Sequence, residues 1–216
     1  RDRQSIWDGL TRKETYGTSG DRILLWFDLV QQDSLIPMGS SVNLNKNPKF
    51  RVKAVGAFEQ KSGCPDYTST NITEEEIEKI CKNECYNPSD IRKNISRIEV
   101  VKITPQISKE ENINNLIIDS WKTFDCKPNQ QGCEVEFIDE DFAASSRDSI
   151  YYVRAIQEPS PVVNGGNLRC TYNDKGECIK VNICYGDSRT DKEDDCLSLS
   201  EERAWSSPIY VNFNNI

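Results

Sequence analysis

The chain has 216 residues, of which 27 are Lys or Arg, 35 are Asp or Glu and none is His, so its formal net charge is −8. Without histidine, a Ser–His–Asp triad, a Cys–His pair and a His-ligated zinc site are all excluded within this chain. The acidic balance, without a long Lys/Arg run, argues against a nucleic-acid partner. The longest apolar run, residues 23–27, is far shorter than the roughly 18 residues that a membrane-spanning helix needs, so no membrane span is expected.

The N-terminal pattern predicts a helix over residues 4–16. Ile6 and Leu10 stand four residues apart with Trp7 beside them, as on one face of a helix. Gly17 follows this stretch and is a natural residue at which a helix ends.

Two strands are predicted next. Residues 22–30 are apolar at positions that point to both faces of a strand, which is typical of a central strand covered on both sides. Residues 49–58 instead alternate, with Phe50, Val52 and Ala54 on one face and basic side chains on the other. This alternation predicts a half-buried antiparallel strand.

The clearest local signal predicts a second helix over residues 73–85. Thr73 and Glu76 have the spacing of a capping box, in which each side chain accepts a hydrogen bond from the backbone of the other. Within this helix, Ile77 and Ile80 are expected to face the core.

Later segments predict a mainly β fold. Residues 105–132 are expected to form mostly loop, with Trp121 as one anchor. Further strands are expected at residues 96–104, 134–138, 149–157, 168–173, 177–184 and 209–213. Many short strands with one helical insertion near residues 73–85 predict an antiparallel β-sandwich.

The nine cysteines favour disulfides in an oxidising compartment, either periplasmic or secreted, because no pair has the Cys-x-x-Cys spacing of zinc and thioredoxin-like sites. Short loops favour three bridges, which join Cys126 to Cys133, Cys170 to Cys178 and Cys184 to Cys196. Cys64 then remains to pair with either Cys81 or Cys85, and Cys85 is our candidate for its partner.

Two groups of carboxylates are candidate functional sites. The acidic loop 187–195 supplies oxygen atoms that could bind calcium, but it lacks the ordered ligand spacing of a calcium loop and is interpreted as a solvated charged loop. Residues 139–141 with Asp148 could act as paired acids, but they are interpreted as surface charges at the ends of strands.

Three stretches, residues 1–27, 151–158 and 203–210, together resemble the C-terminal third of a bacterial family of unknown function. Their clearest runs are Tyr16-Gly17-Thr18-Ser19-Gly20 before Arg22, Tyr-Tyr-Val-Arg-Ala-Ile-Gln-Glu from 151, and Arg-Ala-Trp-Ser-Ser-Pro-Ile-Tyr from 203. That family looks related to metal-dependent phosphoesterases of the polymerase-and-histidinol-phosphatase (PHP) superfamily, in which a β/α barrel holds divalent metal ions that activate water.

The resemblance implies that residues 1–20 are the last helix and loop of an upstream barrel, and that residues 21–216 form an appended disulfide-rich domain. The divalent metal ions and their ligands would belong to that barrel, so no catalytic, cofactor-binding or metal-binding residue is expected in this chain. Candidates for packing on the barrel or for the rim of its substrate cleft are Arg22, Arg154, Gln157, Arg203 and Trp205.

We therefore expect the C-terminal accessory domain of an exported PHP-like hydrolase, with its own barrel as partner and an unidentified small-molecule substrate. The alternative is a free-standing secreted module that binds a carbohydrate or a protein. The accessory domain should expose an apolar patch around Ile6, Trp7, Leu10 and Ile23, whereas the free-standing module should bury its first helix.

Overall fold

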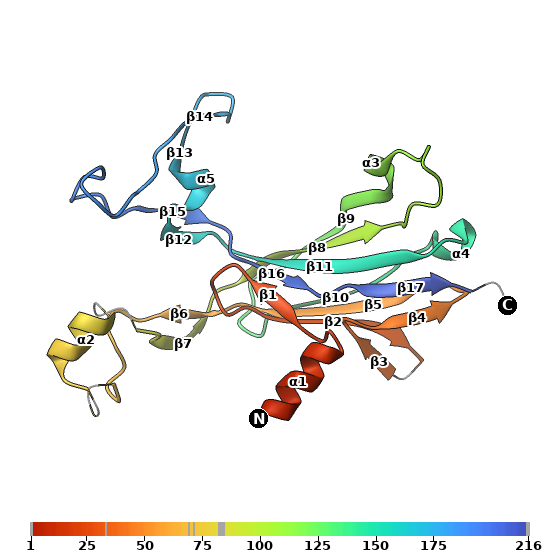
Figure 1. Cartoon of the computed structure of the whole chain (residues 1–216), viewed down its shortest axis with the longest axis horizontal. Helices are drawn as coiled ribbons and strands as arrows, with labels where there is room; N and C mark the ends of the chain where they lie inside the picture. The colour runs from red at the N-terminus through yellow and green to blue at the C-terminus, as the bar shows by residue number, and fades with distance from the viewer. Residues whose placement is uncertain (1, 33, 69, 71, 82–84, 215–216) are drawn as a thin grey trace.

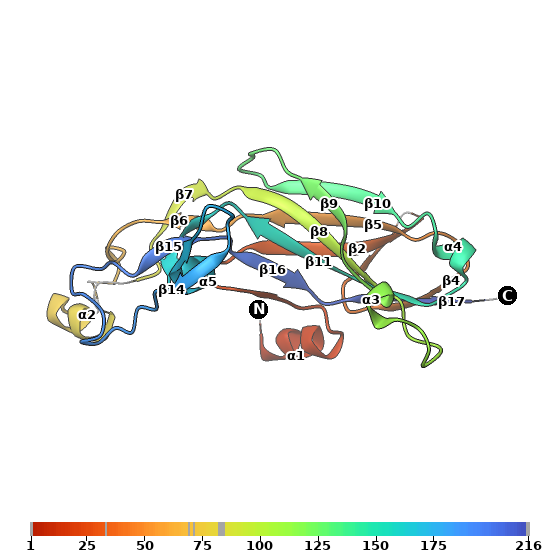
Figure 2. The ribbon, with the colours of Figure 1, turned by 90° about the horizontal axis from the view of Figure 1, so that it is seen from above.

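The computed structural model describes residues 2–32, 34–68, 70, 72–81 and 85–214. The chain is mainly β, and its two largest sheets pack face to face, which confirms the expected sandwich-like fold with few helices. Figures 1 and 2 show the helix α1 (Arg3–Thr11) outside the two sheets and two projections that extend from one end of the sandwich.

The smaller sheet contains four antiparallel strands. In spatial order they are β10 (Cys133–Ile138), β5 (Lys49–Val55), β2 (Leu24–Gln31) and β3 (Ser34–Pro37). Strand β2 is interior to the sheet, as expected, but it buries only the alternate residues Leu25, Phe27 and Leu29, and Trp26 is exposed. The prediction that this strand is covered on both faces is wrong, because the second sheet packs on one face only.

The larger sheet has seven strands. They are β1 (Tyr16–Thr18), β16 (Arg203–Ser206), β11 (Ser149–Gln157), β17 (Ile209–Phe213), β4 (Ser41–Leu44), β8 (Ile95–Ile103) and β9 (Ile117–Asp125). Within residues 105–132, expected to be mostly loop, residues 117–125 instead form β9 and pair with β8 over most of its length. Short helical turns, α3 (Ile113–Leu116) and α4 (Phe142–Ser145), flank this region.

Aromatic rings from both sheets form the centre of the core. The Phe50 ring lies 5.5 Å from that of Phe27, 5.2 Å from that of Phe137 and 4.6 Å from that of Tyr151, measured between centroids. Phe27, Phe50 and Phe137 belong to the smaller sheet and Tyr151 to the larger one, so these contacts join the two layers.

A charged pair is buried beside these rings. Lys102 of β8 places its Nζ 2.5 Å from Oδ2 of Asp139, and the Tyr151 hydroxyl donates to the same oxygen over 2.5 Å. Asp139 is 0% exposed, so its interpretation as a surface charge is wrong. It follows the end of β10, where the second sheet closes over it. Burial, and then the hydrogen bond to Asp139, raises the pKa of Tyr151 above its usual value, so this hydroxyl stays a donor.

Helix α1 is shorter than residues 4–16. Asp2 caps its start by accepting a hydrogen bond from the Ser5 amide over 2.7 Å, and the helix ends at Thr11. Lys13 then takes a left-handed conformation with φ of 57°. The chain does not continue helically to Gly17, because residues 16–18 pair instead with β16.

The capping box of the second helix is confirmed. In α2 (Glu74–Cys81), the Thr73 amide donates to the Glu76 carboxylate over 3.0 Å, and the Glu76 amide donates to the Thr73 hydroxyl over 3.3 Å. Ile77 is buried, but Ile80 is 71% exposed, so the prediction that both face the core is wrong for Ile80. Residues 82–84 of the predicted helix lie outside the described residues.

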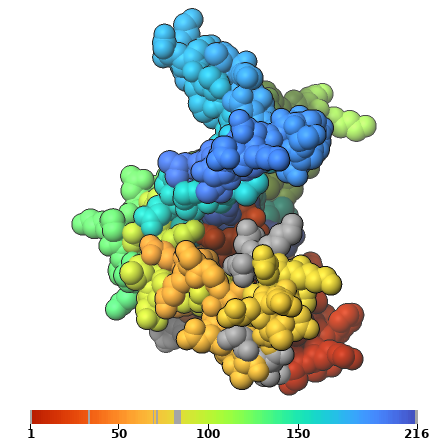
Figure 3. All heavy atoms as spheres, turned by 90° about the vertical axis from the view of Figure 1, so that its left-hand side faces the viewer, coloured from red at the N-terminus to blue at the C-terminus, as the bar shows by residue number. Residues whose placement is uncertain are grey.

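The two projections leave the same end of the sandwich (Figure 1), and Figure 3 looks onto that end, with one projection above and the other below. One contains β6 (Phe58–Gln60), α2 and β7 (Pro88–Arg92). The other contains β12 (Ser160–Val163), α5 (Gly165–Arg169), β13 (Cys170–Tyr172), β14 (Cys178–Val181) and β15 (Leu197–Ser200). The φ angles of residues 166–168 are positive, so α5 is a left-handed turn.

Disulfides cross-link both projections and one edge of the sandwich. The bridges are Cys64–Cys85, Cys126–Cys133, Cys170–Cys178 and Cys184–Cys196. Their Cα–Cα distances of 4.8–5.8 Å lie in the range that a disulfide can span. Four disulfides fit a protein of an oxidising or extracellular compartment. The side chain of Cys81 lies outside the described residues.

Candidate functional site

The buried Gln157 joins several segments at the end of the sandwich that carries the projections. Its side-chain oxygen accepts a hydrogen bond from the Ala57 amide over 3.0 Å, and its side-chain nitrogen donates to Asp21 over 2.5 Å. Asp21 also forms an ion pair of 2.7 Å with Lys93, whose Nζ donates to Ser160 over 3.2 Å. Each of these polar groups already has a partner, so we interpret the cluster as a structural tie, a set of contacts that holds these segments together.

Arg22 lies next to this tie. Its guanidinium group stacks on the Tyr86 ring at 3.9 Å from the centroid, and Arg92 stacks on Phe58 in the same way at 3.7 Å. A hollow of about 170 Å³ lies between the Arg22 loop and Tyr86. The Arg22 guanidinium covers the Tyr86 ring, which belongs to the projection that contains α2. Arg22 therefore holds that projection against the sandwich.

Arg154, Arg203 and Trp205 lie along the larger sheet, where Trp205 stands opposite Arg154 in the ladder and Arg203 opposite Ile156. Arg154 pairs with Glu99 at 2.7 Å and with Asp119 at 3.0 Å. The structure therefore does not gather the five candidate residues into one site.

Glu99 connects Arg154 to a second arginine, Arg97, which also binds both carboxylate oxygens of Glu201, at 2.6 and 2.9 Å. The hydrogen bonds from Arg97 lower the pKa of Glu201 below its ordinary value. A carboxylate with a lowered folded-state pKa stabilises the fold above its unfolded pKa, and this stabilisation is lost as the pH falls through the folded value.

We expect Glu201→Gln to lower the free energy of unfolding by about 1 kcal/mol or less near pH 7, because the pair is partly exposed. The difference from the unsubstituted chain should shrink as the pH falls below the ordinary pKa of a glutamate and then through the lowered folded-state pKa of Glu201. Urea denaturation at pH 7 and at successively lower pH values measures this. Glu193→Gln, in the exposed acidic loop, is the control and should show no such difference; a Glu201→Gln effect that persists at the lower pH would contradict the prediction.

Helix α1 presents its apolar residues to solvent. Ile6 and Trp7 are each 65% exposed and Leu10 is 57% exposed. The less exposed residues are Asp8 and Gly9, and none of the nine residues of α1, all of which the structure describes, is buried. A surface helix of a globular protein normally turns its apolar stripe inward. Here the stripe faces outward, so Ile6, Trp7 and Leu10 form an unpartnered apolar face, which we call the α1 face. Ile23, expected in the same patch, is instead buried at 1% exposure.

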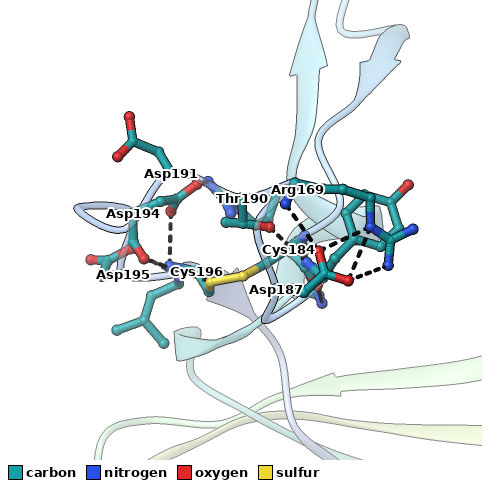
Figure 4. Close-up of a disulfide and its surroundings, with 12 residues drawn as sticks. Arg169, Cys184, Asp187, Thr190, Asp191, Asp194, Asp195 and Cys196 are labelled. Atoms are coloured by element: carbon teal, nitrogen blue, oxygen red, sulfur yellow. Dashed lines mark hydrogen bonds and ion pairs between the residues drawn. A yellow bond between two sulfur atoms is a disulfide. The ribbon is translucent and has the colours of Figure 1, made fainter.

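The acidic loop does not assemble a cation site. Asp187 pairs with Arg189 at 2.7 Å, and Asp194 pairs with Arg169 at 2.8 Å. Asp195 accepts a hydrogen bond from the Leu197 amide over 2.9 Å. Figure 4 shows these carboxylates spread around the Cys184–Cys196 bridge. The hydrogen bonds from Arg189 and Arg169 lower the pKa values of Asp187 and Asp194.

Within the described ranges, no group of three or more His, Cys, Asp or Glu side chains is arranged to hold a metal ion. No chemical step is therefore assigned to the described residues. None of the described helices is long and apolar enough to cross a membrane.

A comparison with protein families matches residues 1–58 to DUF3604, a family of proteins of unknown function. The match covers about a quarter of the chain and runs from α1 through β5. Comparisons with curated proteins and with solved structures found no similar protein.

Proposed function

We propose that this chain is an accessory β-sandwich domain that docks, through the α1 face, on the catalytic domain of an exported hydrolase. The observation that carries this proposal is the outward orientation of Ile6, Trp7 and Leu10. Burying such side chains stabilises a complex by about 1.5–3 kcal/mol each relative to leaving them in water. The α1 face has the composition of the centre of a protein–protein interface, with one aromatic anchor and two aliphatic neighbours.

The family match supports treating α1 as part of this unit. It runs without a break from α1 into the strands of the sandwich, so the same family model describes both. The segment after α1 is also fixed to the sandwich, because the Ser207 amide donates to the Thr15 carbonyl over 3.1 Å and β1 pairs with β16. A helix anchored in this way presents its apolar face in a defined direction.

The resemblance to PHP phosphoesterases supports the hydrolase part of the proposal. In this proposal the catalytic domain is a β/α barrel encoded upstream of Arg1, the barrel supplies the divalent metal ions, and the protein is periplasmic or secreted. This chain contributes shape and orientation, with Arg22 and Gln157 ordering the loops at the end of the sandwich that carries the projections.

The test has two parts. The open reading frame upstream of Arg1 is expected to encode His- and Asp-rich barrel motifs, and that upstream domain, produced separately, is expected to bind this chain in calorimetric titration. Trp7→Ala should weaken binding by at least about tenfold, because a buried aromatic anchor carries a large share of the binding energy.

Ile179→Ala is the matched control for Ile6→Ala, because the two isoleucines are 64% and 65% exposed and only Ile6 lies on the α1 face. Equal effects of these two substitutions would refute docking through α1. Metal-dependent phosphodiester hydrolysis by this chain alone would refute its accessory role.

A further inference from the structure

The outer face of the smaller sheet carries an exposed tryptophan between two hollows. Trp26 of β2 is 45% exposed. One hollow, of about 230 Å³, is lined by Trp26, Asp28, Leu35, Arg51 and Lys53. The second, of about 200 Å³, shares Trp26 and Asp28 and extends to Glu14, Tyr16 and Pro37. The two hollows adjoin at Trp26 and Asp28, and we call them together the Trp26 groove.

Asp28 is a carboxylate of this groove that has neither a hydrogen-bond donor nor an ion-pair partner among the described residues. Its side chain is half-buried, yet no described residue donates a hydrogen bond to it or lies within ion-pair distance. Burial raises the pKa of Asp28, and the nearby Arg51 opposes this effect. A partly buried carboxylate that lacks donors loses hydration without compensation, so a ligand that supplies donors would be favoured here.

Two cations line the groove. Arg51 forms an ion pair of 2.5 Å with Glu134 on β10, and the Lys53 ammonium lies over the Trp26 ring at 6.0 Å from its centroid. The lining thus combines two carboxylates, two cations and two exposed aromatic side chains, Trp26 and Tyr16. A groove with this balanced charge favours a neutral ligand that both donates and accepts hydrogen bonds.

We propose that this groove binds a neutral polysaccharide, with a sugar ring stacked on Trp26, sugar hydroxyls donating to Asp28 and Lys53 donating to a sugar oxygen. A sugar matches the lining because its C–H face is apolar and its rim carries hydroxyls that act as donors and acceptors. A purely apolar ligand would leave Asp28 without a donor.

This inference goes beyond the docking role and stands on different residues. The α1 face consists of Ile6, Trp7 and Leu10, whereas the groove is built from β2, β3, β5 and the segment after α1. Loss of sugar binding with docking intact, or the reverse, would distinguish failure of one proposal from failure of the other.

Affinity electrophoresis of the full chain tests the proposal. In native gels that contain laminarin, barley β-glucan, xylan or galactomannan, at least one polysaccharide is expected to retard the chain. Trp26→Ala should weaken retardation by at least about tenfold, because the aromatic platform contributes most of the stacking contact. Asp28→Asn keeps the shape of the side chain and should also weaken it.

Tyr172→Ala is the control, because Tyr172 is an aromatic of similar exposure, 49%, on the distant β13. It should leave retardation unchanged, and thermal denaturation should show that all three variants fold. The proposal is overturned if no polysaccharide retards the unsubstituted chain, if Trp26→Ala and Asp28→Asn are retarded as strongly as it is, or if Tyr172→Ala loses retardation to the same extent.

Discussion

Asp139→Ala is expected to lower the free energy of unfolding by about 3–5 kcal/mol, because it leaves the Lys102 charge buried without its partner. The Lys102 side chain is only 11% exposed and that of Asp139 is 0% exposed. The substitution also removes the acceptor of the Tyr151 hydroxyl, which then remains unsatisfied inside the core. Both effects act in the same direction.

The position of this cluster explains the size of the expected effect. Lys102 and Tyr151 are opposite each other in the β8–β11 ladder, whereas Asp139 follows β10 of the other sheet. The Lys102 ammonium also lies 5.2 Å from the centroid of the Trp121 ring. The charged pair therefore bridges the two layers at the core, where water cannot replace the missing carboxylate.

Urea denaturation measures the expected loss, and Glu136→Ala, on the strand β10 that precedes Asp139, is the matched control. Glu136 pairs with Lys49 at 2.7 Å, but the side chains of Lys49 and Glu136 are 42% and 48% exposed. An exposed pair contributes about 1 kcal/mol or less. If Asp139→Ala destabilised the chain no more than Glu136→Ala does, the buried pair would not have the proposed role.

Gly39→Ala is expected to destabilise the chain by about 2–4 kcal/mol, because its backbone conformation and its surroundings both exclude a side chain. The φ of Gly39 is +89°, and a Cβ atom there would lie 2.3 Å from the backbone oxygen of Lys13. The Gly39 amide also donates to the Pro208 carbonyl over 2.9 Å. The added methyl group would push away the segment that anchors α1.

The control is Gly63→Ala, since Gly63 has a similar φ of +76° but nothing within 4 Å of the added Cβ. This substitution should lower the free energy of unfolding by only about 1–2 kcal/mol, which is the cost of a left-handed backbone conformation for alanine. Thermal or urea denaturation of the two variants separates the backbone cost from the steric cost. Equal destabilisation would show that the contact between Gly39 and the segment after α1 is not tight.

Local patterns were sufficient for several elements. The alternation of residues 49–58 predicted β5, because one face of that strand meets the core and the other meets water. The Thr73–Glu76 spacing predicted the start of α2 because the capping interaction is made within three residues. The bridges across short loops, such as Cys170–Cys178, could be predicted for the same reason.

Partners far apart in sequence were the source of the errors. The pairing of residues 117–125 with β8, and of residues 16–18 with β16, is not visible in the pattern of either segment alone. The groove at Trp26 was missed as a site because Asp28, Leu35 and Arg51 meet only once three strands are aligned. The exposure of Trp26 could not be read from the sequence either, because it depends on what packs against the outer face of β2.

By itself, the sequence determined the mainly β class, the absence of histidine chemistry, the cap of α2 and the short-loop disulfides, because each depends on residue type or on contacts between near neighbours. Only the tertiary structure decided which charges are buried and which apolar residues are exposed. Asp139 is buried because a second sheet covers the end of β10, and the apolar face of α1 is exposed because β1 anchors the segment that follows the helix at the edge of the larger sheet. Burial depends on what packs against a residue, and those neighbours come from distant parts of the chain.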